Sequence, residues 1–227
     1  MTDYHTHVLP CIDDGAKSIE ESLQMLYESH KQGVDLCVAT PHCTVHNNDD
    51  IGNFIAKRNA SKKILTDAIK SEQKPCPKLL FGAEVNLDND ISRYPDINKL
   101  CIGDTNYMLI ELDINYENKY DEWLYCLFQK EIKPIIAHID RYFNWKSIVS
   151  ALSDLDVIYQ LNATSFFGFG GKKFIHEFMQ YQKPVIIGSD MHGSKYRLTK
   201  MEKAYKKAKK ILGNSAEELF NNTLICL

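Results

Sequence analysis

The stretch Asp3-Tyr4-His5-Thr6-His7-Val8 near the start of the chain predicts a short β-strand with two histidines on one face. Residues i and i+2 of a strand point to the same side, so His5 and His7 would project together. The next apolar run, Val34 to Thr40, is soon followed by another residue of metal-ligating type, His42. Residues of metal-ligating type thus stand at the ends of the first two predicted strands.

Apolar runs and helical patterns alternate through the rest of the sequence. Further strands are expected over Lys78 to Val85, Tyr107 to Leu112, Lys133 to Ala137, Val157 to Leu161 and Val185 to Gly188. Helices are expected over Ile19 to Lys31, Asn53 to Lys70, Tyr120 to Gln129, Asn144 to Leu152, Lys172 to Tyr181 and a long region from Leu198, and the polar stretches Val45 to Asp50 and Asp88 to Asp96 are expected to be loops. Strands alternating with helices predict a parallel α/β fold. The 227 residues fit one domain, residues 1–227.

Nine residues of metal-ligating type stand where these runs break off: His5, His7, Asp14, His42, Glu84, Glu111, His138, Asp190 and His192. Strand ends in a parallel barrel meet at one mouth, which would gather the nine side chains. Imidazole and carboxylate without thiolate suit Mn, Fe or Zn. Taken singly, a His-x-His pair is a weak signal, and Glu84 or Glu111 could form a structural ion pair instead.

Composition excludes several classes of protein. A formal net charge of -3 argues against a broad electrostatic attraction to nucleic acid or anionic lipid. The N-terminus lacks the pattern of a secretory signal, and no apolar run is long enough to span a bilayer. The seven cysteines are odd in number and form no Cys-x-x-Cys pair. We expect reduced thiols, a cytoplasmic protein and no stable membrane insertion.

Six segments, spread over almost the whole chain, resemble the polymerase and histidinol phosphatase (PHP) superfamily. They are the stretch from His5 to Ala16, Ala39-Thr40-Pro41-His42, Gly82-Ala83-Glu84, Leu109-Ile110-Glu111, Ala137-His138 with Arg141-Tyr142, and Gly188-Ser189-Asp190-Met191-His192. Within that superfamily, Ile12-Asp13-Asp14-Gly15-Ala16 is most similar to the bacterial manganese-dependent protein-tyrosine phosphatases of capsular and exopolysaccharide operons, because the broader superfamily usually has His where this branch has Asp14.

The resemblance implies a distorted (β/α)7 barrel of the TIM type with up to three metal ions. His5, His7, Glu84 and Asp190 would hold one ion; Glu84, Glu111 and His138 a second; and Asp14, His42 and His192 a third. Arg141 and Arg197 lie at the spacing of the family's phosphate-binding arginines, and a guanidinium matches phosphate oxygens bidentately.

Two departures from the family pattern stand near these residues. Ile139 and Asp140 replace the usual Pro and Glu between the histidine and arginine of the fifth strand. Cys11 stands where the family commonly has Gly, which would alter the backbone of the first loop.

The chemistry expected from this set is phosphomonoester hydrolysis. Two metals bridged by Glu84 would lower the pKa of a shared water, giving a hydroxide that attacks phosphorus. The substrate implied by the resemblance is phosphotyrosine on a protein, in particular the tail of a tyrosine kinase of capsule or exopolysaccharide assembly. Two alternatives stay open: a phosphatase of small phosphomonoesters such as histidinol phosphate, and a non-catalytic metal-binding module. No Cys-x5-Arg loop for thiol catalysis is present.

Overall fold

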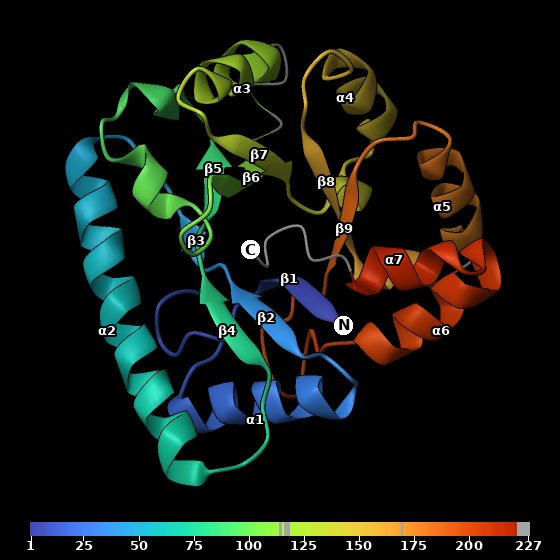
Figure 1. Cartoon of the computed structure of the whole chain (residues 1–227). Helices are drawn as coiled ribbons and strands as arrows, with labels where there is room; N and C mark the ends of the chain where they lie inside the picture. Colours follow the sequence, from blue (N-terminus) through green and yellow to red (C-terminus); the bar gives the residue numbers. More distant parts are fainter. Residues whose placement is uncertain (114, 116–118, 169, 222–227) are drawn as a thin grey trace.

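The computed structural model describes residues 1–113, 115, 119–168 and 170–221. Its strands are β1 (Thr2–Thr6), β2 (Leu36–Ala39), β3 (His42–Cys43), β4 (Lys78–Phe81), β5 (Glu84–Leu87), β6 (Tyr107–Leu112), β7 (Lys133–Ile136), β8 (Ile158–Asn162) and β9 (Val185–Gly188). Its helices are α1 (Ile19–Lys31), α2 (Asn48–Glu72), α3 (Tyr120–Phe128), α4 (Trp145–Ala151), α5 (Gly171–Met179), α6 (Met201–Leu212) and α7 (Ser215–Asn221). The helices lie around the outside of the strands (Figure 1).

Every strand pairing in the described residues is parallel, so the predicted α/β class is confirmed. The strands form two sheets, in the orders β1-β2-β4 and β3-β5-β6-β7-β8-β9. The sequence predicted one barrel, whereas hydrogen-bonded pairing in the described residues gives these two sheets and no single closed one. An isolated parallel bridge between Thr6 and Met191 links the end of β1 to the segment after β9.

Two details of the strands correct the sequence prediction: a short strand that was not predicted, β3, follows the second predicted strand, and the third predicted strand is divided. Pro41 stands between β2 and β3, and a proline has no N–H to donate to a sheet. The run predicted as one strand from Lys78 to Val85 divides into β4 and β5 around Gly82 and Ala83. Glu84 therefore begins a strand where the sequence predicted that it ends one.

A cluster of buried apolar side chains joins the two sheets. It comprises Tyr4, Val38, Ile102, Leu109, Ile135, Ala137, Ile158 and Ile186, with the partly buried Leu80 and Tyr107 against it. These residues come from β1, β2 and β4 of the smaller sheet and from β6 to β9 of the larger one, or lie beside those strands. The hydrophobic effect of burying these side chains together holds the two sheets against each other.

Two helical regions differ from the predicted ranges. The stretch Val45 to Asp50 was expected to be a loop, but α2 begins within it because Asn47 and Asp50 form a capping box. The other expected loop, Asp88 to Asp96, contains a 3-10 turn at Ile91–Arg93. The long final helix expected from Leu198 is instead two helices, α6 and α7, with Gly213 between them at a φ of 61°.

Cys11, the departure noted in the first loop, adopts a left-handed backbone with a φ of 57°. A side chain with a Cβ costs about 1–2 kcal/mol in that conformation, whereas glycine adopts it freely. Cys11 thus adopts a conformation that a glycine at this position would take without that cost. The Cys11 thiol donates to the carbonyl of Lys17 at 3.0 Å, which helps to hold the turn.

Six cysteines lie in the described part of the chain and all six are free thiols; Cys226 lies outside it. Among the described helices, none combines the length and the apolar character that crossing a membrane requires.

Candidate metal centre

The structure brings all nine predicted ligand side chains together at one edge of the strands. His5 lies on β1, His42 on β3, Glu84 on β5 and Glu111 on β6. His7 directly follows β1, and His138, Asp190 and His192 follow β7 and β9, while Asp14 comes from the loop before α1. The convergence fits the prediction, and the role of each residue as a ligand remains a prediction.

Glu84 lies at the centre of the cluster with its side chain 1% exposed. Its Oε2 lies 3.1 Å from His5 Nε2, 3.3 Å from His7 Nε2 and 3.0 Å from His42 Nδ1. Its Oε1 lies 2.8 Å from His138 Nε2. One buried carboxylate thus faces four imidazoles, as expected of a residue that bridges two ions.

Three groups of ligand atoms are compact enough to share an ion. They are His7, Asp14, His42 and His192; His5, His7 and Asp190; and His42, Glu84 and Glu111. The sequence assigned His7 and His42 to one group each, whereas in the structure each belongs to two. His138, placed with Glu84 and Glu111, lies 3.6 Å from Glu111 Oε1.

The histidines are oriented by residues that the sequence reading did not select. The Nδ1 of His5 lies 3.0 Å from Gln160 Oε1, and the Nδ1 of His7 lies 2.7 Å from Asp13 Oδ2. An Nδ1–H that donates to either oxygen leaves the Nε2 lone pair free for a metal. The two Nε2 atoms face each other at 3.1 Å, so each imidazole aims its free nitrogen at the same space.

The sixth predicted strand, β8, carries Gln160 and a second supporting amide, Asn162. On β8, Gln160 Oε1 also accepts from the His138 N–H at 2.7 Å, and Gln160 Nε2 donates to Asn162 Oδ1 at 3.0 Å. Asn162 Nδ2 in turn donates to Asp190 Oδ2 at 3.4 Å. The sequence signal was two amides in an otherwise apolar run.

Asp140, the other departure from the family pattern, contacts the backbone of Asn162. Its Oδ1 accepts from the Asn162 N–H at 2.7 Å. Burial raises the pKa of the Asp140 carboxyl to about 6, although the hydrogen bond from Asn162 opposes that shift. Asp140, which has a shorter side chain than the glutamate usual in the family, therefore holds the end of β8 at Asn162.

The donor set fits bound metal ions. His192 Nε2 is buried and makes no hydrogen bond within the described residues. A buried polar atom without a partner costs about 1–3 kcal/mol, and Glu84 Oε2 and His192 Nε2 both aim at neighbouring ligand groups. Nitrogen and oxygen donors without thiolate suit Mn, Fe or Zn.

Without metal, the charge of Glu84 holds protons on two of the imidazoles, those of His5 and His42. Burial alone would lower the pKa of His5, but the charge of Glu84 outweighs it and raises that pKa to about 9. The hydrogen bond to Glu84 likewise raises the pKa of His42 to about 9, against the opposing effect of burial. Burial opposes ionisation of Glu84, yet the facing His5, His138 and His42 hold its pKa well below the usual range.

We predict that metal uptake releases protons and tightens as pH rises. His5 and His42 are protonated at pH 7 because each pKa is raised to about 9, and a ligating imidazole must be neutral. Uptake at pH 7 should therefore release about two protons, and affinity should rise up to about pH 9 and then level. Calorimetric titration with Mn²⁺ in buffers of different ionisation enthalpy measures this release. An affinity that is constant between pH 6 and pH 9 would contradict it.

The backbone at the site is held in uncommon conformations. His138, Asp190 and Arg197 have φ values of 31°, 53° and 50°, in the left-handed region that non-glycine residues rarely adopt. Since β9 ends at Gly188, Asp190 and His192 lie beyond the strand, and strand alternation does not align them. The left-handed turn at Asp190 aims both side chains into the cluster.

Two glycines allow the close approach of these elements. A Cβ on Gly188 would lie 2.5 Å from His5 Cβ and 2.8 Å from Gln160 Nε2. A Cβ on Gly15 would lie 2.3 Å from the carbonyl oxygen of His7. The Asp-Asp-Gly-Ala motif of the first loop can therefore pack on His7 only because its third residue is glycine.

Arg141 and Arg197 converge on Asp190 from two different loops. Arg141 Nη1 and Arg197 Nη2 lie 3.2 Å and 2.8 Å from the same Asp190 Oδ2. Their side chains are 52% and 44% exposed, so both guanidiniums reach solvent beside the cluster. Two half-exposed cations that meet at one point form a site suited to an anion.

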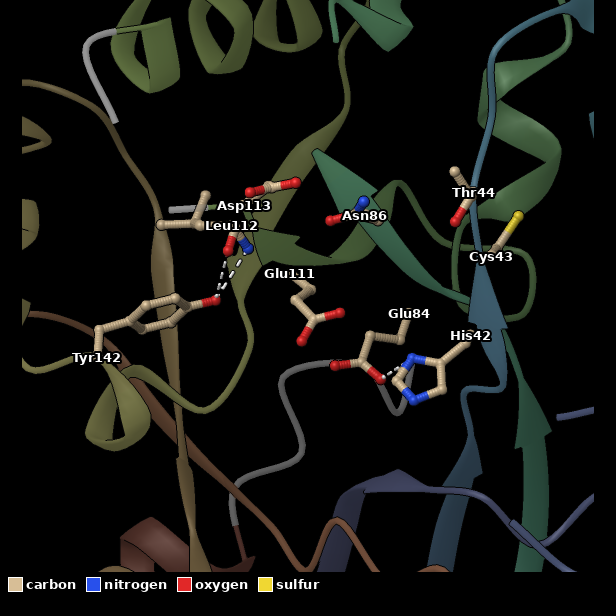
Figure 2. Close-up of a pocket in the computed structure, with 9 residues that line it drawn as sticks. All are labelled: His42, Cys43, Thr44, Glu84, Asn86, Glu111, Leu112, Asp113 and Tyr142. Atoms are coloured by element: carbon tan, nitrogen blue, oxygen red, sulfur yellow. Dashed lines mark hydrogen bonds and ion pairs between the residues drawn. The ribbon is translucent and has the colours of Figure 1, made fainter. Parts of the chain in front are cut away.

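A cleft of about 500 Å³ opens on the opposite side of the cluster. Figure 2 shows His42, Glu84 and Glu111 projecting into it from three neighbouring strands. Across the cleft, the Tyr142 hydroxyl accepts from the Leu112 N–H at 2.9 Å and lies 3.2 Å from the Leu112 carbonyl. Tyr142 thereby fixes the end of β6 that carries Glu111.

Fold and site together define a parallel α/β protein with a candidate multinuclear metal centre beside a pair of half-exposed arginines. The chain belongs to the CpsB/CapC family of capsular polysaccharide synthesis, whose profile matches residues 1–224. The predicted resemblance to the capsule-operon branch is thus confirmed for the family.

Named relatives and a solved structure agree with that membership. The chain is 30% identical to tyrosine-protein phosphatase CpsB of Streptococcus pneumoniae, over 97% of this chain and 95% of that protein. It is 30% identical to tyrosine-protein phosphatase YwqE of Bacillus subtilis (strain 168), over 87% and 79%. A crystal structure from work on YwqE and CpsB, described as "unique metal-dependent tyrosine phosphatases", aligns with a TM-score of 0.80 and 26% identity, covering 98% of this chain and 95% of that one.

Proposed function

We propose that this protein is a metal-dependent phosphatase that hydrolyses phosphotyrosine on proteins. The observation that carries the proposal is the convergence of eight imidazole and carboxylate side chains around a ninth, buried Glu84, beside two arginines that meet at Asp190. The relatives named above are tyrosine-protein phosphatases, described for CpsB and YwqE as metal-dependent. Their names give no support to histidinol phosphate as the substrate.

The nine side chains would hold up to three ions, and Mn²⁺ is the ion we favour, with Fe or Zn as substitutes. When bound, such ions supply a water of lowered pKa as nucleophile and offset the charge of the phosphoryl oxygens. Gln160 and Asp13 keep the Nε2 atoms of His5 and His7 aimed at the centre. Glu84 contributes negative charge that those ions would balance.

Arg141 and Arg197 would bind the phosphate. In the structure both guanidiniums contact Asp190 Oδ2, which an incoming phosphate would replace as their partner. A guanidinium offers paired N–H donors that match two phosphoryl oxygens, and it stabilises the negative charge that shifts among those oxygens during transfer.

A phenolic leaving group suits this arrangement. Tyrosine has a pKa of about 10, far below that of an alkyl alcohol, so its phenolate departs with little protonation. We assign no general acid. The free thiols of the described cysteines take no part in the proposed reaction.

We propose that the two parallel sheets together form the distorted (β/α)7 barrel and that residues 1–227 act as one domain. In support, buried side chains from strands of both sheets share one cluster. The Thr6–Met191 bridge joins β1 to the segment after β9, and Glu84 N–H donates to the Pro41 carbonyl at 3.0 Å where β2 gives way to β3.

The protein substrate we propose is the phosphorylated tail of a tyrosine kinase of capsule or exopolysaccharide assembly. The family's role in capsular polysaccharide synthesis supports this choice. We place the reaction in the cytoplasm, a compartment that keeps thiols such as the six described cysteines reduced.

The test is phosphate release by Mn²⁺-loaded protein from a phosphotyrosyl peptide and from histidinol phosphate. We expect a clear preference for the peptide and for aryl phosphates over alkyl phosphates, unchanged by prior alkylation of thiols. Faster turnover of histidinol phosphate, or inactivation traced to one modified cysteine, would overturn the proposal.

A further inference from the structure

A second cleft, of about 560 Å³, lies on the arginine side of the cluster. Its lining includes Arg141, Asn162, Arg197, Leu198 and Lys200. These residues follow β7, β8 and β9, which are neighbours in the larger sheet. The cleft therefore continues outward from the arginine pair.

Exposed apolar side chains lie close in sequence to the two arginines that line this cleft, and one of them, Leu198, lines the cleft itself. Six large apolar side chains are exposed in the described residues, and three of them, Phe143, Tyr196 and Leu198, lie within two positions of Arg141 or Arg197. Phe143 and Tyr196 are the most exposed, at 84% and 85%. Two positions correspond to at most about 7.6 Å between Cα atoms, so the backbone of Phe143 lies close to that of Arg141, and the backbone of Tyr196 close to that of Arg197.

The backbone on both sides of Phe143 is anchored, so its exposure is fixed by the fold. Tyr142 is held by the backbone of Leu112. Trp145 packs against Phe174 and Phe178 with ring centroids 5.2 Å and 5.5 Å apart. Phe143, between these two anchored aromatics, is the one that points to solvent.

The loop that carries Tyr196 is pinned in the same way. Ser194 N–H donates to Glu21 Oε1 of α1 at 3.1 Å, and His192 N–H donates to the Arg197 carbonyl at 3.1 Å. Gln32 Nε2 donates to the Thr199 carbonyl at 3.2 Å. A loop fastened at three points still presents Tyr196 to solvent.

We propose that Phe143, Tyr196 and Leu198, here named the apolar rim, dock the protein segment around the phosphotyrosine and select for aromatic or aliphatic residues next to it. The inference rests on the proposed function, because the phosphate must first sit on Arg141 and Arg197. Those guanidiniums and Lys200, which makes no ion pair within the described residues, complement the phosphate's charge. Exposed aromatics are the side chains that most often anchor a partner segment.

The test compares two phosphotyrosyl peptides, one with aromatic neighbours and one with glycine and serine neighbours, alongside p-nitrophenyl phosphate. In the Phe143→Ser/Tyr196→Ser variant, kcat/KM for the aromatic peptide should fall about tenfold, mainly through KM. That fall should exceed the fall on p-nitrophenyl phosphate at least fivefold. Phe143→Leu should retain most of the preference. Tyr125→Ser, an exposed tyrosine on α3 outside both clefts, is the matched control and should behave as wild type.

Binding of the aromatic peptide with a non-hydrolysable phosphonate in place of phosphate, measured by fluorescence anisotropy, gives a readout independent of turnover. The double variant should bind it about tenfold more weakly than wild type. Equal losses on all three substrates, or unchanged peptide binding, would overturn the inference while leaving the phosphatase proposal intact. Failure of wild type to hydrolyse any of the three would instead count against the proposed function, and the binding measurement would still decide the docking role.

Discussion

Replacing His138 or Asp190 by alanine is expected to lower kcat/KM for a phosphotyrosyl peptide at least about a hundredfold, or roughly 2.7 kcal/mol of transition-state stabilisation. His138 Nε2 lies 2.8 Å from Glu84 Oε1 and 3.6 Å from Glu111 Oε1. Its loss therefore removes one ligand from the predicted group of Glu84, Glu111 and His138. Asp190 lies close to His5 and His7 and also receives both arginines. Its loss should disturb metal binding and phosphate binding together.

Elemental analysis of each variant shows whether activity falls with metal content. His176→Ala, at an exposed histidine on α5, is the matched control and should keep full metal content and rate. Circular dichroism confirms folding. Wild-type turnover by a folded His138→Ala or Asp190→Ala protein would refute the assigned ligand roles.

Replacing Arg141 or Arg197 by alanine should lower kcat/KM at least about tenfold, the equivalent of roughly 1.4 kcal/mol, while metal content stays unchanged. Both guanidiniums meet at Asp190 Oδ2 and are about half exposed, so each can turn to a phosphate. Lysine should rescue poorly because it lacks the planar pair of donors. The separation of activity from metal content distinguishes these residues from the ligands.

Arg93→Ala is the control, since Arg93 bonds Asn89 and stacks on Tyr94 away from the cluster. Steady-state kinetics and elemental analysis on the same preparations give both quantities. Unchanged kinetics in both Arg141→Ala and Arg197→Ala would mean that phosphate is held by other groups.

The parts of the site that follow from local periodicity could be predicted from sequence. His5 and His7 share a face because residues alternate along a strand, and their Nε2 atoms do meet, at 3.1 Å. Glu111 and His138 lie at strand ends that the apolar runs mark clearly. In each case the placement of the residue follows from a few neighbouring residues in the sequence.

Features that depend on distant contacts could not be predicted. Gln160 orients His5 across 155 positions of sequence, and no local pattern reports that contact. The division of the strand at Gly82, which packs closely on Ile102, and the left-handed turn at Asp190 are also set by tertiary packing. The membership of His7 and of His42 in two candidate ligand groups each is likewise a tertiary feature that no local pattern indicates.

The most direct measurement of the central claim is phosphate release from a phosphotyrosyl peptide by protein stripped of metal with a chelator and then supplied with Mn²⁺. We predict no release by the stripped protein and recovery on addition of Mn²⁺, because the buried donors around Glu84 are arranged for metal ions. Release at the full rate by protein in which elemental analysis detects no metal would contradict it.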